Sequence, residues 1–94
     1  MSVIIVGGHE RMESVYKKVG KKYGCKVKVF THMETNFQKR IGNADYIFML
    51  SDVVSHKLVN TAMKVSKQRK IPRKRLINGS LTTVEDTFRE VKAI

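Results

Sequence analysis

The chain has 94 residues, which is enough for one domain with a single hydrophobic core and too few for two. Its 19 lysines and arginines against 8 aspartates and glutamates give a net charge of +11, so we expect attraction to polyanions such as nucleic acid. No apolar run approaches the about 20 residues of a membrane span, and no signal peptide follows Met1. The lone Cys25 excludes an intrachain disulfide, and we expect a cytoplasmic protein.

Four short segments have the composition of β-strands. Residues 3–6 and 47–50 are apolar throughout, as expected of central strands that are covered on both faces. Residues 26–31 alternate between apolar and lysine side chains, which predicts a strand at an edge of the sheet. Leu76-Ile77 is short and apolar and predicts the fourth strand.

Helical patterns follow the first two strands. An apolar stripe at helical spacing runs from Met12 to Tyr23, and Gly24 is placed to end that helix. A shorter helix is predicted over residues 35–41. Gly42 then ends it, because glycine is a common helix terminator.

Two further helices are predicted in the second half of the chain. Ser51-Asp52 can cap the third helix, whose apolar stripe runs to about Arg69. Pro72 closes this segment, because the residue before a proline avoids helical angles. Thr82 and Glu85 have the spacing of a capping box, which predicts a last helix.

The alternation of strand and helix predicts a parallel sheet, because parallel neighbours require crossover helices. We expect the strand order 2-1-3-4, which places the two most apolar strands in the middle. The predicted fold is therefore a small Rossmann-like three-layer α/β domain over residues 1–94, with helices on both faces of a four-stranded sheet. Its open sheet edges predict a homodimer.

Polar residues and all three histidines of the chain follow the C-terminal ends of the predicted strands. Because these ends meet at one edge of a parallel sheet, we expect the polar side chains to form a ligand site there. The candidate ligand-binding residues are Gly7, Gly8, His9, Arg11, His32, Ser51, Asp52, Ser55, His56 and Ser80.

Several chemistries are compatible with this edge, and the sequence leaves them open. Gly7-Gly8 before a helix can bind a phosphate with Arg11 as a clamp, or can simply make a tight turn. Neither a P-loop nor a dinucleotide-binding motif is present. The histidines and Asp52 can instead bind a metal ion or haem. A third use is acid–base or nucleophilic catalysis by Asp52 and His56.

A second feature is a run of positive charge at the end of the third helix and after it. No acidic residue lies between Lys57 and Arg75, so a polyanion would relieve the repulsion among these side chains. The alternative is a solvated charged surface that partly complements the helix dipole. Because the run leads into the fourth strand, we expect it at the end of the sheet opposite the histidines. The candidate nucleic-acid contacts are Lys64, Lys67, Arg69, Lys70, Arg73, Lys74 and Arg75.

Nearly the whole chain resembles the short bacterial proteins of the family named domain of unknown function 2325. The resemblance rests on Gly7-Gly8, Arg11, His32, Ala44-Asp45, the D-x-V-S-H motif of residues 52–56, and Ser80. It implies a Rossmann-like fold whose polar residues face one pocket, and it brings no established activity. Some relatives carry cysteines around this motif and in the following helix, where this chain has Val53 and Ser66, so the resemblance does not extend to a thiol-dependent redox or metal role.

These features together favour a non-enzymatic binding module for a phosphate-bearing ligand, either a nucleotide or the backbone of a nucleic acid. The C-terminal edge of the sheet would bind the ligand, and the basic surface would add general attraction. A metal- or haem-binding protein that uses the histidines is the first alternative. A small hydrolase or phosphotransfer enzyme that uses Asp52 and His56 is the second. The sequence identifies no cofactor.

Overall fold

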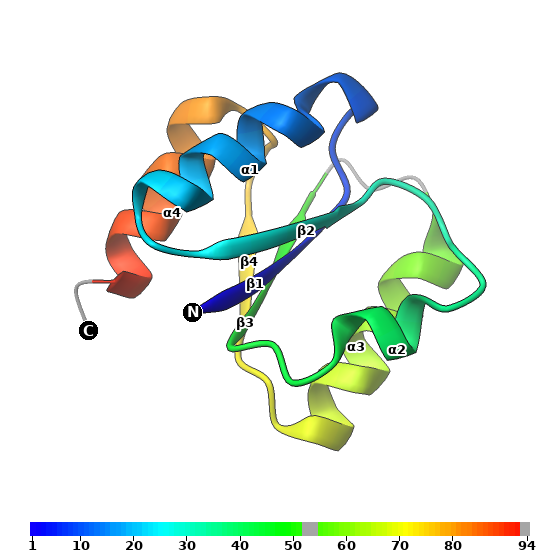
Figure 1. The fold of residues 1–94 in the computed structure, drawn as a ribbon. Helices are drawn as coiled ribbons and strands as arrows, with labels where there is room; N and C mark the ends of the chain where they lie inside the picture. The colour runs from blue at the N-terminus through cyan, green and yellow to red at the C-terminus, as the bar shows by residue number, and fades with distance from the viewer. Residues whose placement is uncertain (52–54, 93–94) are drawn as a thin grey trace.

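The computed structural model describes residues 1–51 and 55–92. Within these residues, four strands form one parallel sheet in the order β2-β1-β3-β4, which confirms the predicted order and fold class (Figure 1). The strands are β1 (Ser2–Val6), β2 (Lys26–Phe30), β3 (Tyr46–Leu50) and β4 (Arg73–Leu76). The two apolar strands, β1 and β3, are central because their side chains must be buried on both faces.

Helices cover both faces of this sheet. A short 3₁₀ helix, η1 (Glu10–Met12), leads into α1 (Glu13–Lys22), which lies beside α4 (Leu81–Lys92) on one face (Figure 1). On the other face lie α2 (Phe37–Ile41) and α3 (His56–Arg69). None of the helices in the described part of the chain is long and apolar enough to cross a lipid bilayer.

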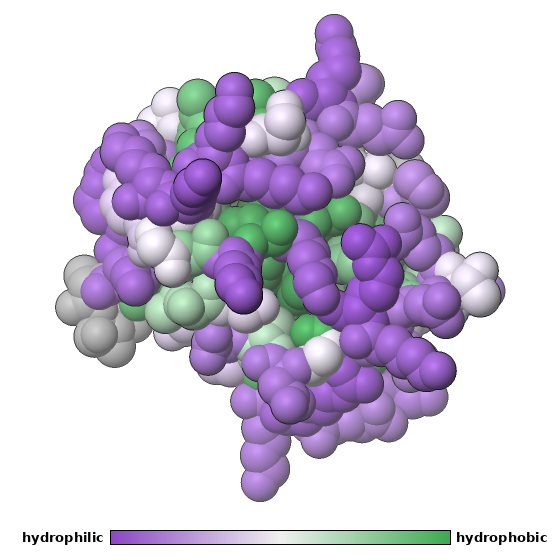
Figure 2. All heavy atoms as spheres, in the orientation of Figure 1, coloured by the Kyte–Doolittle hydropathy of each residue, from purple (hydrophilic) through white to green (hydrophobic). Residues whose placement is uncertain are grey.

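The alternation of side chains along β1 divides the core into two layers. Val3 and Ile5 pack with the residues under α1 and α4, and Ile4 and Val6 pack with those under α2 and α3. All four side chains are fully buried. Hydrophilic side chains cover most of the face seen in Figure 2, and apolar surface shows at its centre and in smaller patches toward the rim.

Gly24 ends the first helical segment as predicted. Its φ of 73° is a left-handed conformation that glycine adopts without a steric cost. The Gly24 N–H donates to the Lys21 carbonyl, and the Cys25 N–H donates to the Gly20 carbonyl. These two bonds form a Schellman motif, which satisfies the last carbonyls of α1 and turns the chain into β2.

The fourth strand differs from its prediction. The strand is Arg73–Leu76 rather than Leu76-Ile77, and Ile77 lies beyond it with 81% of its surface exposed. Pairing with β3 decides the position, because Ile47 is opposite Arg73 and Leu50 is opposite Leu76. An edge strand with one open face tolerates charged side chains, so its composition does not resemble that of a buried strand.

Both predicted caps in the second half of the chain are wrong. Ser55 caps α3, since its hydroxyl accepts the N–H of Leu58 at 3.2 Å, and Asp52 lies outside the described residues. Ser80 caps α4, since its hydroxyl accepts the N–H of Thr83 at 3.3 Å. In each case the serine that aims its hydroxyl at the first free N–H groups becomes the cap.

Candidate functional site

Gly7 and Gly8, which form the turn after β1, both have a structural role. The Gly7 N–H donates to the carbonyl of Phe30 at 2.8 Å. Gly8 has a φ of 80°, and a Cβ there would lie 3.0 Å from the Leu50 Cδ1 and 3.1 Å from the Tyr16 hydroxyl. The turn therefore needs glycine for its backbone and for close packing, without any need to invoke a phosphate.

The residues after this turn also bond to one another. His9 caps η1, because its Nδ1 accepts the Arg11 N–H at 3.2 Å and faces the Arg11 Nε at 3.4 Å. His32 is exposed, with its Nδ1 3.7 Å from the Glu10 carboxylate and 3.2 Å from the Thr31 hydroxyl. The turns after β1 and β2 are thus adjacent, as the sequence predicted, and their polar groups bond mainly to each other.

A metal centre has little support in the described residues. Across residues 1–51 and 55–92, no three His, Cys, Asp or Glu side chains lie close enough together to hold a metal ion. His56 stands at the start of α3, where it lines a different site from His9 and His32. Asp52, which is common to the metal and the catalytic alternatives, lies outside the described part.

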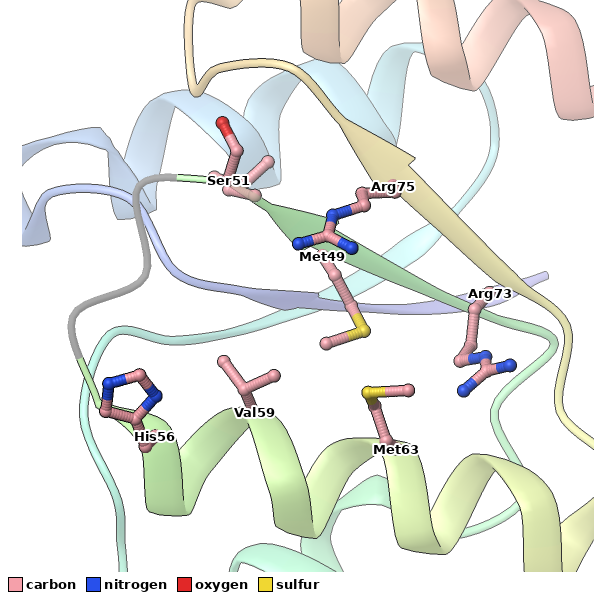
Figure 3. Close-up of a pocket in the computed structure, with 8 residues that line it drawn as sticks. Met49, Ser51, His56, Val59, Met63, Arg73 and Arg75 are labelled. Carbon is pink, nitrogen blue, oxygen red and sulfur yellow. The ribbon is translucent and has the colours of Figure 1, made fainter.

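A pocket opens between β3, β4 and α3. It has a volume of about 420 Å³, and its lining at the C-terminal edge of the sheet includes two of the predicted ligand-binding residues, Ser51 and His56 (Figure 3). Ser51 also donates its hydroxyl to the carbonyl of Ile77, which fixes the end of β3 beside the end of β4. The lining residues are Met49, Leu50, Ser51, His56, Val59, Met63, Arg73 and Arg75.

Regular secondary structure brings these side chains together. Arg73 and Arg75 are two apart in β4 and therefore extend on the same side of the sheet, toward α3. His56, Val59 and Met63 are three and four apart in α3, so they form one stripe along the side of the helix that faces β4. The pocket is the space between that stripe and the two arginines. We call it the α3–β4 pocket.

The charge of the α3–β4 pocket is unbalanced. Arg73 and Arg75 are exposed and form no ion pair with any residue in 1–51 or 55–92. Lys74, between them, points to the other side of the sheet and binds Glu90 of α4. That hydrogen bond, together with the negative charge of Glu90, raises the pKa of Lys74 above its ordinary value of 10.5.

Two of the seven predicted nucleic-acid contacts thus line the pocket, and two others have structural partners. Arg69 donates to the carbonyls of Gln38 and Gly42 at 3.0 and 2.9 Å, which ties the end of α3 to the end of α2. Lys74 is paired with Glu90. The remaining three, Lys64, Lys67 and Lys70, are exposed at or near the C-terminal end of α3.

The basic run and the C-terminal edge are not fully separate, contrary to the prediction. Arg73 and Arg75 line the same pocket as Ser51 and His56. The prediction failed because it placed both arginines in a loop before the fourth strand, whereas both lie within β4. It also missed Met49, Val59 and Met63, although the spacing of His56, Val59 and Met63 along α3 is visible in the sequence.

Nearly the whole chain matches a known protein family. The family model described as "Uncharacterized protein conserved in bacteria (DUF2325)" matches residues 2–91. The chain belongs to this family. The DUF2325 match covers both walls of the α3–β4 pocket, and the family description assigns them no activity. No curated protein matches the sequence.

A solved structure supports the fold of this DUF2325 protein. The chain is similar to a de novo designed protein with the Rossmann 2×2 fold, with a TM-score of 0.63 and 10% sequence identity. The similarity covers 98% of this chain and 86% of the designed one. At this identity the likeness concerns the fold alone, so function must be argued from the site.

Proposed function

We propose that this DUF2325 protein is a non-enzymatic binding module for a phosphate-bearing ligand, a nucleotide or the backbone of a nucleic acid, and that the α3–β4 pocket receives it. One observation carries the proposal. Arg73 and Arg75, which have no acidic partner among the described residues, share a pocket with Ser51 and His56. Unpaired positive charge beside a concave surface is a natural receptor for an anion.

The chemistry of the lining suits a phosphate. Guanidinium groups bind phosphate oxygens through two parallel hydrogen bonds, which a lysine cannot do. The His56 ring, at the C-terminal edge of the sheet, can add a polar contact, whereas the Ser51 hydroxyl is already donated to the Ile77 carbonyl. The volume of about 420 Å³ lies within the range of small-ligand sites, about 300–1,000 Å³. The net charge of +11 would further attract a polyanion.

The proposal places the main phosphate contacts on β4 rather than at Gly7-Gly8. The glycine turn is engaged in its own backbone and packing, and the Arg11 guanidinium faces His9. Arg73 and Arg75 have no such engagement in the described part of the chain. Groups without internal partners lose less when they bind a ligand, so the pocket is the better receptor.

Fluorescence anisotropy with a short labelled oligonucleotide, measured over a salt series, tests the proposal. Replacing both pocket arginines, Arg73→Gln with Arg75→Gln, should weaken binding by at least about tenfold, because charged hydrogen bonds contribute more than neutral ones. The matched control is Lys18→Gln with Lys21→Gln, which removes the same charge from exposed positions on α1. It should weaken binding by no more than about threefold, through the general field alone.

Comparing the two double variants separates binding in the pocket from diffuse attraction. A larger loss in the β4 variant supports the pocket. Equal losses would mean that diffuse charge does the binding, and would overturn the proposal. Absence of binding by wild-type protein to the oligonucleotide, to ATP and to pyrophosphate would also overturn it.

The proposal includes a homodimer in the cytoplasm. β2 and β4 are the outer strands of the sheet, and an unpaired strand edge is commonly covered by association. Cys25 is a free, buried thiol, which suits a reducing compartment. Light scattering coupled to gel filtration should give twice the 10.8 kDa chain mass, and a single chain mass would reject the dimer.

A further inference from the structure

The floor of the α3–β4 pocket is apolar although it is open to solvent. Met49 of β3 and Met63 of α3 are only partly buried, and so is Val59. In Figure 3, Met49 points from the sheet toward the helix while Val59 and Met63 point from the helix toward the sheet. The two thioether groups thus face each other across the pocket, next to Arg73 and Arg75.

Met49 packs against the core under α3, but Val59 and Met63 are not part of that core. The buried stripe of α3 is formed by Leu58, Ala62 and Val65, which lie in the core beneath α2 and α3. Val59 and Met63 flank that stripe on the side toward β4. Apolar side chains in this position therefore leave an apolar surface exposed beside two cations.

We propose that the Met49–Val59–Met63 surface is a subsite for the base of a nucleoside phosphate. This inference rests on the proposed function and specifies its ligand: an aromatic heterocycle between the two methionines, with its phosphate on Arg73 and Arg75. Thioether sulfur makes favourable contacts with aromatic rings, and flexible methionines adapt to a flat ligand. A free phosphate, a polyphosphate or a sugar phosphate would leave this apolar floor unused.

The size of the pocket favours a base over a lipid tail. A volume of about 420 Å³ accommodates a compact ligand, whereas a long acyl chain requires an extended channel. The occupant must also be anionic at one end only, since the cations stand on the β4 wall and the floor is apolar. A nucleoside monophosphate has this polarity, whether it is free or the end of a single strand.

Calorimetric titration with four probes tests the subsite: AMP, ribose 5-phosphate, hexyl phosphate and pyrophosphate. AMP should bind about tenfold more tightly than ribose 5-phosphate, because only AMP covers the floor. It should also bind more tightly than hexyl phosphate, because an alkyl chain lacks the aromatic contact with sulfur. A short oligonucleotide as a fifth probe distinguishes a free nucleotide from a strand, according to which binds more tightly.

Truncation of the floor separates the base from the phosphate. Met63→Ala should weaken AMP about three- to tenfold and leave pyrophosphate unchanged, whereas the Arg73→Gln, Arg75→Gln variant weakens both. The matched control is Met33→Ala, a partly buried methionine near α2 that does not line this pocket and should not alter AMP binding. Amide NMR spectra of each variant show whether it is folded.

The outcomes distinguish the two proposals. If AMP binds no better than ribose 5-phosphate or hexyl phosphate, the base subsite is rejected while phosphate binding stands. If Met63→Ala weakens AMP and pyrophosphate equally, the floor does not contact a base and the inference also fails. If none of the probes binds, the proposed function fails first.

Discussion

The two sides of β4 differ in cover and in charge. Toward α4, Leu76 is buried in the core and Lys74 is paired with Glu90. Toward α3, Arg73 and Arg75 are exposed beside an open pocket. One strand of four residues thus belongs to a closed structural layer on one side and to a candidate binding surface on the other.

The arrangement of the helices produces this difference. α4 packs against β4, whereas α3 packs against the two central strands, β1 and β3. α1 and α4 also lie side by side, and the ion pair between Lys22 and Glu85 joins them. The last strand is therefore covered on one face only, although both faces of the central strands carry a buried core layer. The difference teaches that the open side of this sheet is local to β4, and there lies the pocket that we propose as the binding site.

The largest effect on stability should come from the closed face. Phe88 is fully buried, with its ring centroid 5.0 Å from that of Phe48 in an edge-to-face contact. Phe88→Ala should cost about 3–5 kcal/mol of the free energy of unfolding, through lost burial and the cavity left behind. Met63→Ala on the open face should cost less than about 1.5 kcal/mol, because its side chain is already partly in water. Urea denaturation measures both, and equal costs would contradict the contrast between the faces.

An intermediate effect is expected where α1 approaches β2. A Cβ at Gly20 would lie 2.1 Å from the Val27 Cγ2, so Gly20→Ala forces side chain or helix to move. Overpacking costs about 1–3 kcal/mol, which exceeds the gain of about 1 kcal/mol from replacing glycine in a helix. Thermal unfolding should therefore show a lower melting temperature.

A second substitution identifies the cause. In a Val27→Ala background the nearest obstacle is gone, so Gly20→Ala should cost less there than in the wild type. If the cost is the same in both backgrounds, close packing against β2 is not the reason for the glycine.

The fold could be predicted because its strongest signals are local and mutually consistent. The apolar run Val3–Val6 indicates a strand that is covered on both faces and is therefore central in the sheet. Right-handed crossovers then restrict the order of the other strands. The position of β4 is harder to predict, since its sequence Arg-Lys-Arg-Leu has almost no apolar pattern. Hydrogen bonding to β3 makes it a strand, and that pairing is not encoded in its composition.

Only part of the candidate site could be predicted from the order of strands and loops. Ser51 and His56 could be expected near a pocket because they follow a central strand, and the structure places them there. His9 and His32 follow strands equally well, yet their polar contacts are with Arg11, Glu10 and Thr31. Which polar groups are satisfied internally depends on side-chain geometry across loops, and sequence order does not supply it.

The smallest effect expected here compares neighbours within β4 at alkaline pH. The pKa of Lys74 is raised by its hydrogen bond to Glu90, so above its ordinary value of 10.5 the folded protein binds more protons than the unfolded chain. The contribution of the pair is complete below that pH and is lost as the pH rises through the raised pKa. Lys74→Gln should lower the melting temperature slightly at neutral pH, and this difference from wild type should vanish well above pH 10.5.

Arg75→Gln is the matched control one residue further along the strand. Arg75 has no ion pair in the described part of the chain, so its replacement should shift stability by no more than about 0.5 kcal/mol, equally at both pH values. A Lys74→Gln difference that stays constant with pH would contradict the pairing on the closed side. An Arg75→Gln cost well above about 0.5 kcal/mol at both pH values would instead reveal an anionic partner for that arginine, because arginine and carboxylates keep their charges over this pH range. Arg75 would then no longer be free to receive a phosphate, and the contrast between the two sides of β4 would be lost.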